Sequence, residues 1–157
     1  MARKPTRGSV AGLKRRITIA GGGLAGLSLA HALRRHEVPV TVIEAGRYPR
    51  HRVCGEFISG VTDETLALLG LDGLFDDSLV HHGVCWHDGE RALLRDHLAT
   101  PARGISRHAL DQRLHDRIVA IGGEVITRQR ALPQPREGHV WAAGRRPQQG
   151  PWIGLKA

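Results

Sequence analysis

Residues 21–26 read Gly21-Gly22-Gly23-Leu24-Ala25-Gly26, which fits the pattern Gly-x-Gly-x-x-Gly. A short apolar run at 17–20 precedes this motif, and residues 24–36 after its third glycine carry leucines and alanines at helical spacing. A second β-branched run at 40–43 completes a strand–helix–strand unit, whose connection is expected to be right-handed. A glycine motif between a strand and a helix is typical of a loop that binds the phosphates of a dinucleotide.

The glycines of this motif have separate physical roles. Gly21 permits a tight turn after the strand, Gly23 lets a pyrophosphate approach the backbone, and Gly26 lets the helix pack closely on the strand. The helix begins at Leu24 and Ala25, where free N–H groups and the helix dipole favour an anion. These five residues are therefore predicted to bind the cofactor.

Glu44 and Ala45 follow the second apolar run, about twenty residues beyond the glycine motif. An acidic side chain at this place accepts hydrogen bonds from the hydroxyls of an adenosine ribose, and its charge disfavours the 2′-phosphate of NADP. The motif and Glu44 together do not distinguish FAD from NAD. A glycine-rich turn beside a surface glutamate, in an unrelated α/β protein, is the structural alternative to a binding site.

The rest of the chain predicts a mixture of further helices and strands. Periodicity and turn residues favour a helix at 61–69, a hairpin at 80–94, a helix at 107–121 and a strand at 124–127. Thr62 and Ser106 are the expected N-caps of the two helices, and Asp88-Gly89 is the expected turn of the hairpin. From Arg128 onward, prolines and glycines leave no clear period.

Composition narrows the class of protein. The 157 residues include 23 Lys and Arg against 15 Asp and Glu, a net charge of +8. These cations are scattered rather than gathered in a stripe, so nucleic acid is not a predicted partner. No apolar run is long enough to span a bilayer, and glycines in the run after Arg15-Arg16 disfavour a twin-arginine export signal. Cys54 and Cys85 form no disulfide framework, which favours a reducing compartment, the cytoplasm.

A cluster of histidines and a cysteine was the one candidate for metal binding. His81, His82, Cys85 and His87 lie close in the sequence, and three of them share one face of a strand. A structural zinc site needs four ligands, and no second cluster supplies the fourth. No metal site is predicted.

Three separated segments resemble one family. Residues 48–56, Tyr-Pro-Arg-His-Arg-Val-Cys-Gly-Glu, resemble the P-x-x-x-x-C-G-E segment of FAD-dependent oxidoreductases of the geranylgeranyl reductase type, which are aromatic-hydroxylase-like flavoproteins. Residues 104–111 resemble the helix start R-x-x-L/F-D-x-x-L of that family, and residues 122–125 resemble part of its A-x-x-x-G-A-x-V continuation. The resemblance implies FAD as cofactor, with Cys54 and Gly55 near the flavin. It also implies that Arg107 binds FAD and that the backbone of Ala131 contacts the adenine side.

The chain also departs from this family. Ala142-Ala143-Gly144 stands where the family has an A-D-G motif, so Ala143 replaces the aspartate that supports the cofactor. The segment before it is too short for the family's strand meander, and a second flavin motif of the G-D-A-A-H kind is absent. The expectation is an N-terminal fragment with three parts: a flexible basic leader at 1–16, an FAD-binding domain at 17–131 with an inserted segment at 60–103, and a truncated, irregular tail at 132–157.

The expected fold class is α/β, a Rossmann-like FAD/NAD(P)-binding parallel sheet with an inserted β-hairpin segment, incomplete at the C-terminus. The first functional hypothesis is the FAD-binding part of a monooxygenase or C=C reductase, whose full-length parent acts on a small-molecule or lipid-like substrate. The alternatives are a non-catalytic truncated product and an NAD-binding module. No catalytic side chain is predicted, and the chain is expected to be too short for activity alone.

Overall fold

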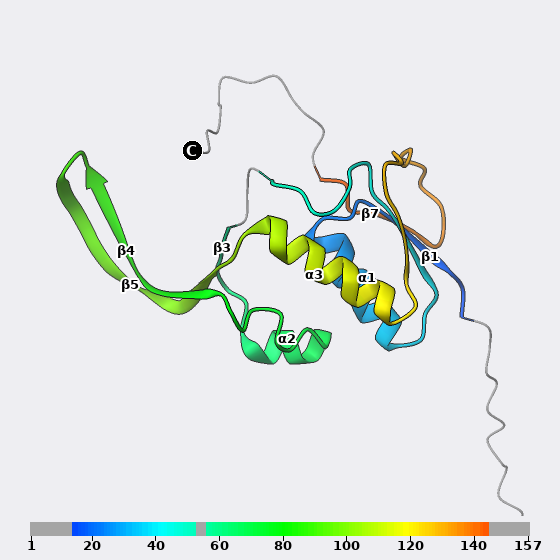
Figure 1. The fold of residues 1–157 in the computed structure, drawn as a ribbon, viewed down its shortest axis with the longest axis horizontal. Helices are drawn as coiled ribbons and strands as arrows, with labels where there is room; N and C mark the ends of the chain where they lie inside the picture. The colour runs from blue at the N-terminus through cyan, green and yellow to red at the C-terminus, as the bar shows by residue number, and fades with distance from the viewer. Residues whose placement is uncertain (1–13, 53–55, 145–157) are drawn as a thin grey trace, which may run out of the picture.

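The structure is a computed structural model that describes residues 14–52 and 56–144. Its elements follow the order β-α-β, then a segment of three strands and one helix, then α-β-β (Figure 1). They are β1 Ile17–Ala20, α1 Leu24–Arg35, β2 Val40–Ile43, β3 Phe57–Ile58, α2 Asp63–Leu69, β4 Leu79–Asp88, β5 Arg91–Gly104, α3 Arg107–Ala120, β6 Glu124–Ile126 and β7 His139–Trp141.

A parallel sheet of four short strands, in the order β6-β2-β1-β7, forms the centre of the molecule. Helix α1 packs on β1 and β2, and α3 packs on α1 and β6. Alternate residues of the strands face these helices: Ile19 pairs with Val42 in register, and both are fully buried. They join Leu27 of α1 with Leu110 and Leu114 of α3 in one apolar core. The expected α/β class with a parallel sheet is confirmed.

Local hydrogen bonds determine where helices α2 and α3 begin. The Thr62 hydroxyl accepts the N–H of Thr65, and α2 ends at Gly70, whose φ of 68° is left-handed. The Ser106 hydroxyl likewise accepts the N–H of His108 and begins α3. The two N-caps expected from the sequence are therefore confirmed.

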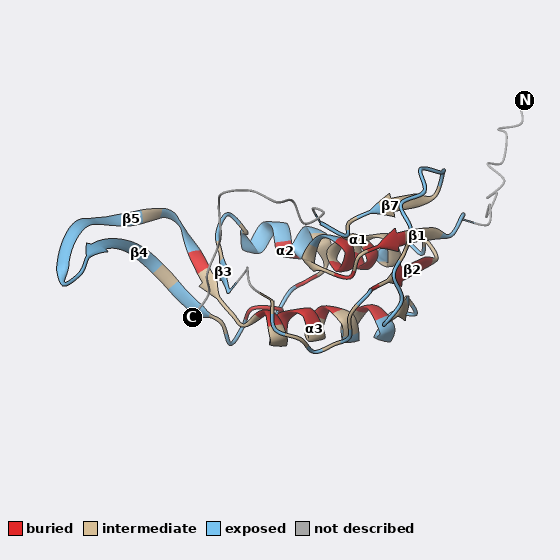
Figure 2. Cartoon of the chain, turned by 90° about the horizontal axis from the view of Figure 1, so that it is seen from above, coloured by how far each residue is buried: buried red, intermediate tan, exposed pale blue. Residues whose placement is uncertain are grey.

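Strands β4 and β5 form a long antiparallel hairpin that projects from the helices and the parallel sheet (Figures 1 and 2). Its turn follows Asp88, with Gly89 at a φ of 59°, as the sequence predicts. Nearly every residue of the hairpin is exposed, including Trp86 and Leu94, which pair across it. We call residues 82–98 the hairpin arm. At its base, β5 also pairs with β3.

The structure differs most from the sequence-based expectation in the tail, residues 132–157. Residues 132–157 were expected to be irregular, but His139–Trp141 forms β7, which pairs in parallel with β1. The backbone N–H of Ala142 extends this ladder by donating to the carbonyl of Ala20, at 2.7 Å. A three-residue strand among prolines has too few residues to display a period, so backbone pairing and not sequence pattern identifies it. The expected leader at 1–16 lies mostly outside the described residues.

Candidate functional site

The glycine turn lies at the carboxyl end of β1, and its geometry explains two of its glycines. Gly21 has a φ of 108°, a left-handed conformation that favours glycine, and a side chain there would collide with the backbone of Ala142. A side chain at Gly26 would collide with the carbonyl oxygen of Gly21, so α1 packs closely beneath the turn. Gly23, the N-cap of α1, has open space where a side chain would stand.

Glu44 lies at the end of β2 with its carboxylate turned toward the glycine turn. It accepts the N–H of Gly22 at 2.8 Å and that of Gly46 at 2.7 Å. The guanidinium groups of Arg50 and Arg52 lie 3.4 and 3.5 Å from its two oxygens. Burial alone would raise the pKa of Glu44, but these N–H groups and positive charges outweigh it and hold the pKa below its ordinary value. The carboxylate is therefore held as a buried anion.

Tyr48 covers the glycine turn from the loop after β2. Its hydroxyl donates to the carbonyl oxygen of Gly22 at 2.6 Å, and its ring lies 4.8 Å from that of His115 on α3. Burial and the negative charge of Glu44 raise the pKa of the Tyr48 hydroxyl, so it stays protonated as a hydrogen-bond donor. The loop after β2 is thereby tied to both the turn and α3.

Arg107 and Asp111 form a buried ion pair on the first turns of α3. Arg107 Nε donates to Asp111 Oδ1 at 2.8 Å, and Arg107 Nη2 donates to Oδ2 at 3.0 Å. Arg52 Nε donates to the same Oδ2 at 2.6 Å, and Arg52 Nη2 reaches the carbonyl oxygen of Gly22 at 3.3 Å. We call Arg52, Arg107 and Asp111 the arginine–aspartate cluster. It connects α3 to the glycine turn.

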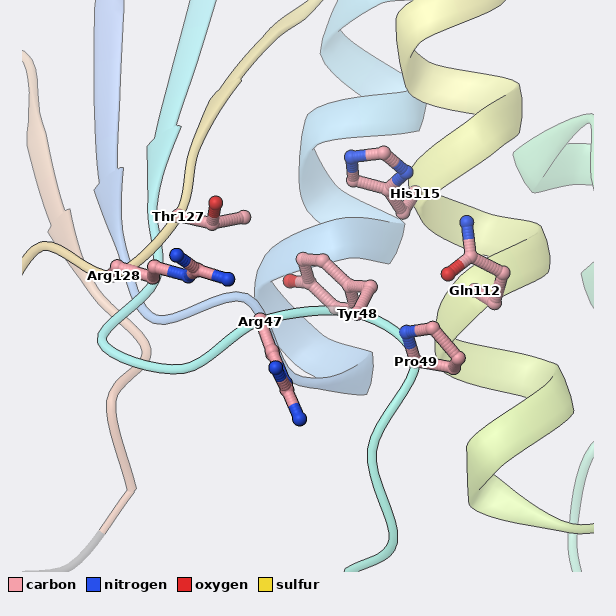
Figure 3. A pocket seen from close by; sticks show the side chains of 7 residues that line it. All are labelled: Arg47, Tyr48, Pro49, Gln112, His115, Thr127 and Arg128. Carbon is pink, nitrogen blue, oxygen red and sulfur yellow. The ribbon is translucent and has the colours of Figure 1, made fainter.

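A pocket of about 650 Å³ lies beside the loop after β2, between α3 and the end of β6 (Figure 3). The pocket has two arginines and no acidic side chain in its lining: Arg47, Tyr48, Pro49, Gln112, His115, Thr127 and Arg128. The N–H of Arg128 donates to the carbonyl oxygen of Gly46 at 2.8 Å, next to the N–H that Glu44 accepts. The pocket therefore adjoins the site of Glu44.

The structure brings most of the predicted cofactor residues to the carboxyl edge of the parallel sheet. The glycine turn and Glu44 meet there, and the exposed Ala45 directly follows Glu44. Arg107 is connected to them through Asp111 and Arg52. Ala131 lies in a loop whose Gln129 N–H donates to the carbonyl oxygen of Glu44 at 3.1 Å. This loop lines a pocket of about 580 Å³ with Ala20 and Ile43, the residues directly before Gly21 and Glu44. Cys54 and Gly55 lie outside the described residues. The cofactor-binding role of each of these residues stays a prediction.

Comparisons with known proteins agree with this geometry. Residues 19–68 match the family of NAD(P)-binding Rossmann-like domains. The fold of this chain is Rossmann-like. No curated protein matches the chain.

Several solved structures share the fold over most of this chain. The tetrameric form of 2-methyl-3-hydroxypyridine-5-carboxylic acid oxygenase is 26% identical with a TM-score of 0.66, over 76% of this chain and 33% of that one. A probable FAD-dependent monooxygenase from Pseudomonas aeruginosa is 20% identical with a TM-score of 0.61, over 78% and 36%. A myxobacterial chondrochloren halogenase, a variant of FAD-dependent halogenases, is 21% identical with a TM-score of 0.60, over 73% and 28%. The chain spans about a third of the length of these proteins.

Two kinds of feature are absent from the described residues. No group of three or more His, Cys, Asp or Glu side chains within 14–52 and 56–144 is placed to hold a metal ion. No helix in the same ranges is long and apolar enough to cross a lipid bilayer.

Sequence reasoning missed three residues that shape the site, namely Tyr48, Arg52 and Asp111. Tyr48 and Arg52 lie in a loop without periodicity, so only the folded chain shows that they reach Gly22. For Asp111 a signal was available. Arg107 and Asp111 are four residues apart on a predicted helix, a spacing that places opposite charges side by side.

Proposed function

We propose that this chain binds the ADP part of FAD at the carboxyl edge of its parallel sheet. The pyrophosphate lies over Gly23 and the first N–H groups of α1, at Leu24 and Ala25, and the adenosine ribose lies beside Glu44. The observation that carries this proposal is the open space over Gly23, which adjoins a buried carboxylate bonded to Gly22. Backbone N–H groups at a helix start favour phosphate, and a carboxylate has lone pairs left for ribose hydroxyls.

The side chains around Glu44 support a polar ligand. Arg50 Nε is buried and has no hydrogen-bond partner among the described residues. A buried donor without an acceptor costs free energy, and a ligand oxygen would relieve that cost. The contacts of Arg50 and Arg52 to Glu44, at 3.4 and 3.5 Å, are longer than ideal charge-assisted hydrogen bonds, so a ribose could share the carboxylate with them.

FAD is favoured over NAD by the loop after Glu44 and by Arg107, which resemble FAD-dependent oxidoreductases of the geranylgeranyl reductase type. Structural neighbours described as FAD-dependent also support it. On this proposal Cys54 and Gly55 lie near the flavin, and Ala131 lies on the adenine side. FAD would supply the redox chemistry when bound, while these residues bind and orient it.

The parent activity that we propose is that of an FAD-dependent monooxygenase or C=C reductase. Its substrate would be a small molecule or a lipid-like compound, and its compartment the cytoplasm, where free cysteines stay reduced. An NAD-binding module is the second candidate, because the matched family is described as NAD(P)-binding. A non-catalytic protein is the third candidate.

Cofactor identity in the purified chain tests the proposal. We expect oxidised-flavin absorbance in the purified chain, release of FAD on denaturation as measured by mass, and at least tenfold tighter binding of FAD than of NAD in titrations. Release of NAD would support the NAD-binding module and refute FAD. A folded chain that binds neither would support a non-catalytic protein.

A variant of Gly23 separates the binding site from the fold. Gly23→Ser fills the open space, and serine is a good N-cap, so the helix should keep its stability while FAD binding weakens at least tenfold. Ala99→Ser, at an exposed position of β5, is the matched control and should bind FAD as the unmodified chain does. Equal binding by both variants would contradict a pyrophosphate over Gly23.

A further inference from the structure

Asp111 is the most deeply buried acidic side chain among the described residues, with no exposed surface. Each of its oxygens is bonded: Oδ1 accepts Arg107 Nε, and Oδ2 accepts Arg107 Nη2 and Arg52 Nε. A buried charge persists only when it is paired and hydrogen-bonded, and Asp111 meets both conditions. The arrangement fixes two guanidinium groups around one carboxylate.

The position of Arg107 would be unfavourable if Asp111 were not its partner. Arg107 lies in the first turn of α3, where the helix dipole disfavours a cation, and its side chain is only 10% exposed. Two parallel N–H bonds to one carboxylate set the plane of the guanidinium as well as its position. Asp111 therefore determines how Arg107 is presented.

Arg52 brings the same cluster to the glycine turn. One edge of its guanidinium is bonded to Asp111 Oδ2, and Nη2 reaches the carbonyl oxygen of Gly22 at 3.3 Å. The three arginines Arg50, Arg52 and Arg107 contact two carboxylates, Glu44 and Asp111. The oxygens of a bound diphosphate are acceptors that guanidinium groups bind strongly.

We propose that Asp111 is a positioning residue that holds Arg52 and Arg107 at the glycine turn for the pyrophosphate of the dinucleotide. This inference rests on the proposed function. Asp111 does not touch the ligand and acts through the two guanidinium groups. Its removal should therefore weaken the binding of ligands that carry phosphates and spare the binding of adenosine, which carries none.

The ratio of ADP affinity to adenosine affinity tests this inference in the full 157-residue chain. Both ligands are titrated by calorimetry against the unmodified chain and Asp111→Asn, which keeps the size of the side chain and removes its charge. A partly unfolded population scales both apparent dissociation constants by the same factor, so the ratio does not depend on stability. We expect the ratio to fall at least tenfold in Asp111→Asn.

Two further variants make the test specific. Asp77→Asn removes an ion pair between α3 and the segment before β4, where Arg113 Nη1 donates to Asp77 Oδ1 at 2.6 Å, so it should leave the ratio unchanged. Asp111→Asn is also introduced into an Arg107→Ala chain, where one of the two guanidinium groups is already gone. The fold-decrease in the ratio that Asp111→Asn causes there should be at least three times smaller than the fold-decrease it causes in the unmodified chain.

The outcomes separate the positioning role from the proposed function. An unchanged ratio in Asp111→Asn, or equal weakening of ADP and adenosine, would refute the positioning role and leave FAD binding by the unmodified chain intact. An unmodified chain that binds neither FAD nor ADP would refute the proposed function, and the positioning role with it.

Discussion

Two glycines of the same turn have opposite surroundings. Gly26 faces the carbonyl oxygen of Gly21 and the methyl group of Ile19, whereas Gly23 faces open space. Close packing explains the first glycine, and a ligand that approaches the backbone would explain the second. Stability and binding measurements should therefore separate them.

Gly26→Ala should destabilise the fold by about 1–3 kcal/mol, the usual cost of overpacking. The added methyl group would meet backbone and not a flexible side chain, so α1 would have to shift away from β1. Urea unfolding followed by far-UV circular dichroism measures the loss. An unfolding free energy equal to that of the unmodified chain would show that α1 packs less closely than the structure indicates.

His31 should make stability depend on pH. Burial lowers the pKa of His31 below 6.5, and the charges of Arg117 and Arg35 lower it further. These effects outweigh the contact of Nδ1 with the carbonyl oxygen of Leu69, at 3.0 Å, which raises the pKa. The unfolded chain therefore binds this proton at a higher pH than the folded chain does. Stability should be unaffected above pH 6.5 and fall as the pH drops below it.

The variant His31→Asn tests this prediction, because the asparagine side chain keeps an N–H donor and does not titrate. The unfolding free energy of His31→Asn should fall less between pH 7.5 and about 5.5 than that of the unmodified chain. His82→Asn, on the exposed arm, is the control and should follow the unmodified chain. Parallel curves for all three proteins would exclude His31 as the source.

At the level of elements, periodic segments were predictable and short or irregular ones were not. The apolar runs of β1 and β2 and the leucine stripe of α3 bury one face each, so their patterns reflect their packing. The tail gave no such pattern, because β7 has only three residues and is identified by its pairing with β1. The arginine–aspartate cluster depends on the loop after β2 reaching α3, a contact between segments far apart in the sequence.

The hairpin arm should be removable without loss of the central fold. Gly83 and His97 are paired across the hairpin, so replacing residues 84–96 by Asn-Gly would close it with a two-residue turn. The arm is mostly exposed and its strands contact each other more than the rest of the chain. The unfolding free energy should change by less than about 1 kcal/mol, as surface changes usually do.

Unfolding and FAD titration of the shortened chain check this expectation. Exposed Trp86, Val84 and Leu94 would also be removed, so the shortened chain should self-associate less in sedimentation experiments. Loss of the cooperative transition would show that the arm contributes to the central fold.

Across the whole molecule, burial is concentrated around the parallel sheet and its two helices (Figure 2). Local opening is easiest where few apolar contacts hold the backbone. Amide hydrogens of β1 and β2 should therefore exchange with solvent at least tenfold more slowly than those of the hairpin arm. Exchange measured by mass spectrometry on peptides from 17–43 and 82–98 tests this order, and equal rates would contradict it.

The pairing of β1 with β7 has a consequence for synthesis on the ribosome. Thr18 pairs with His139, so two strands from opposite ends of the described chain lie side by side. Chains emerge from their N-terminus, and β1 therefore waits for nearly the whole described chain before its second neighbour arrives. During that interval one edge of β1 has no neighbour from β7. Exposed edges recruit other strands, so the nascent chain is open to mispairing or chaperone binding throughout this interval.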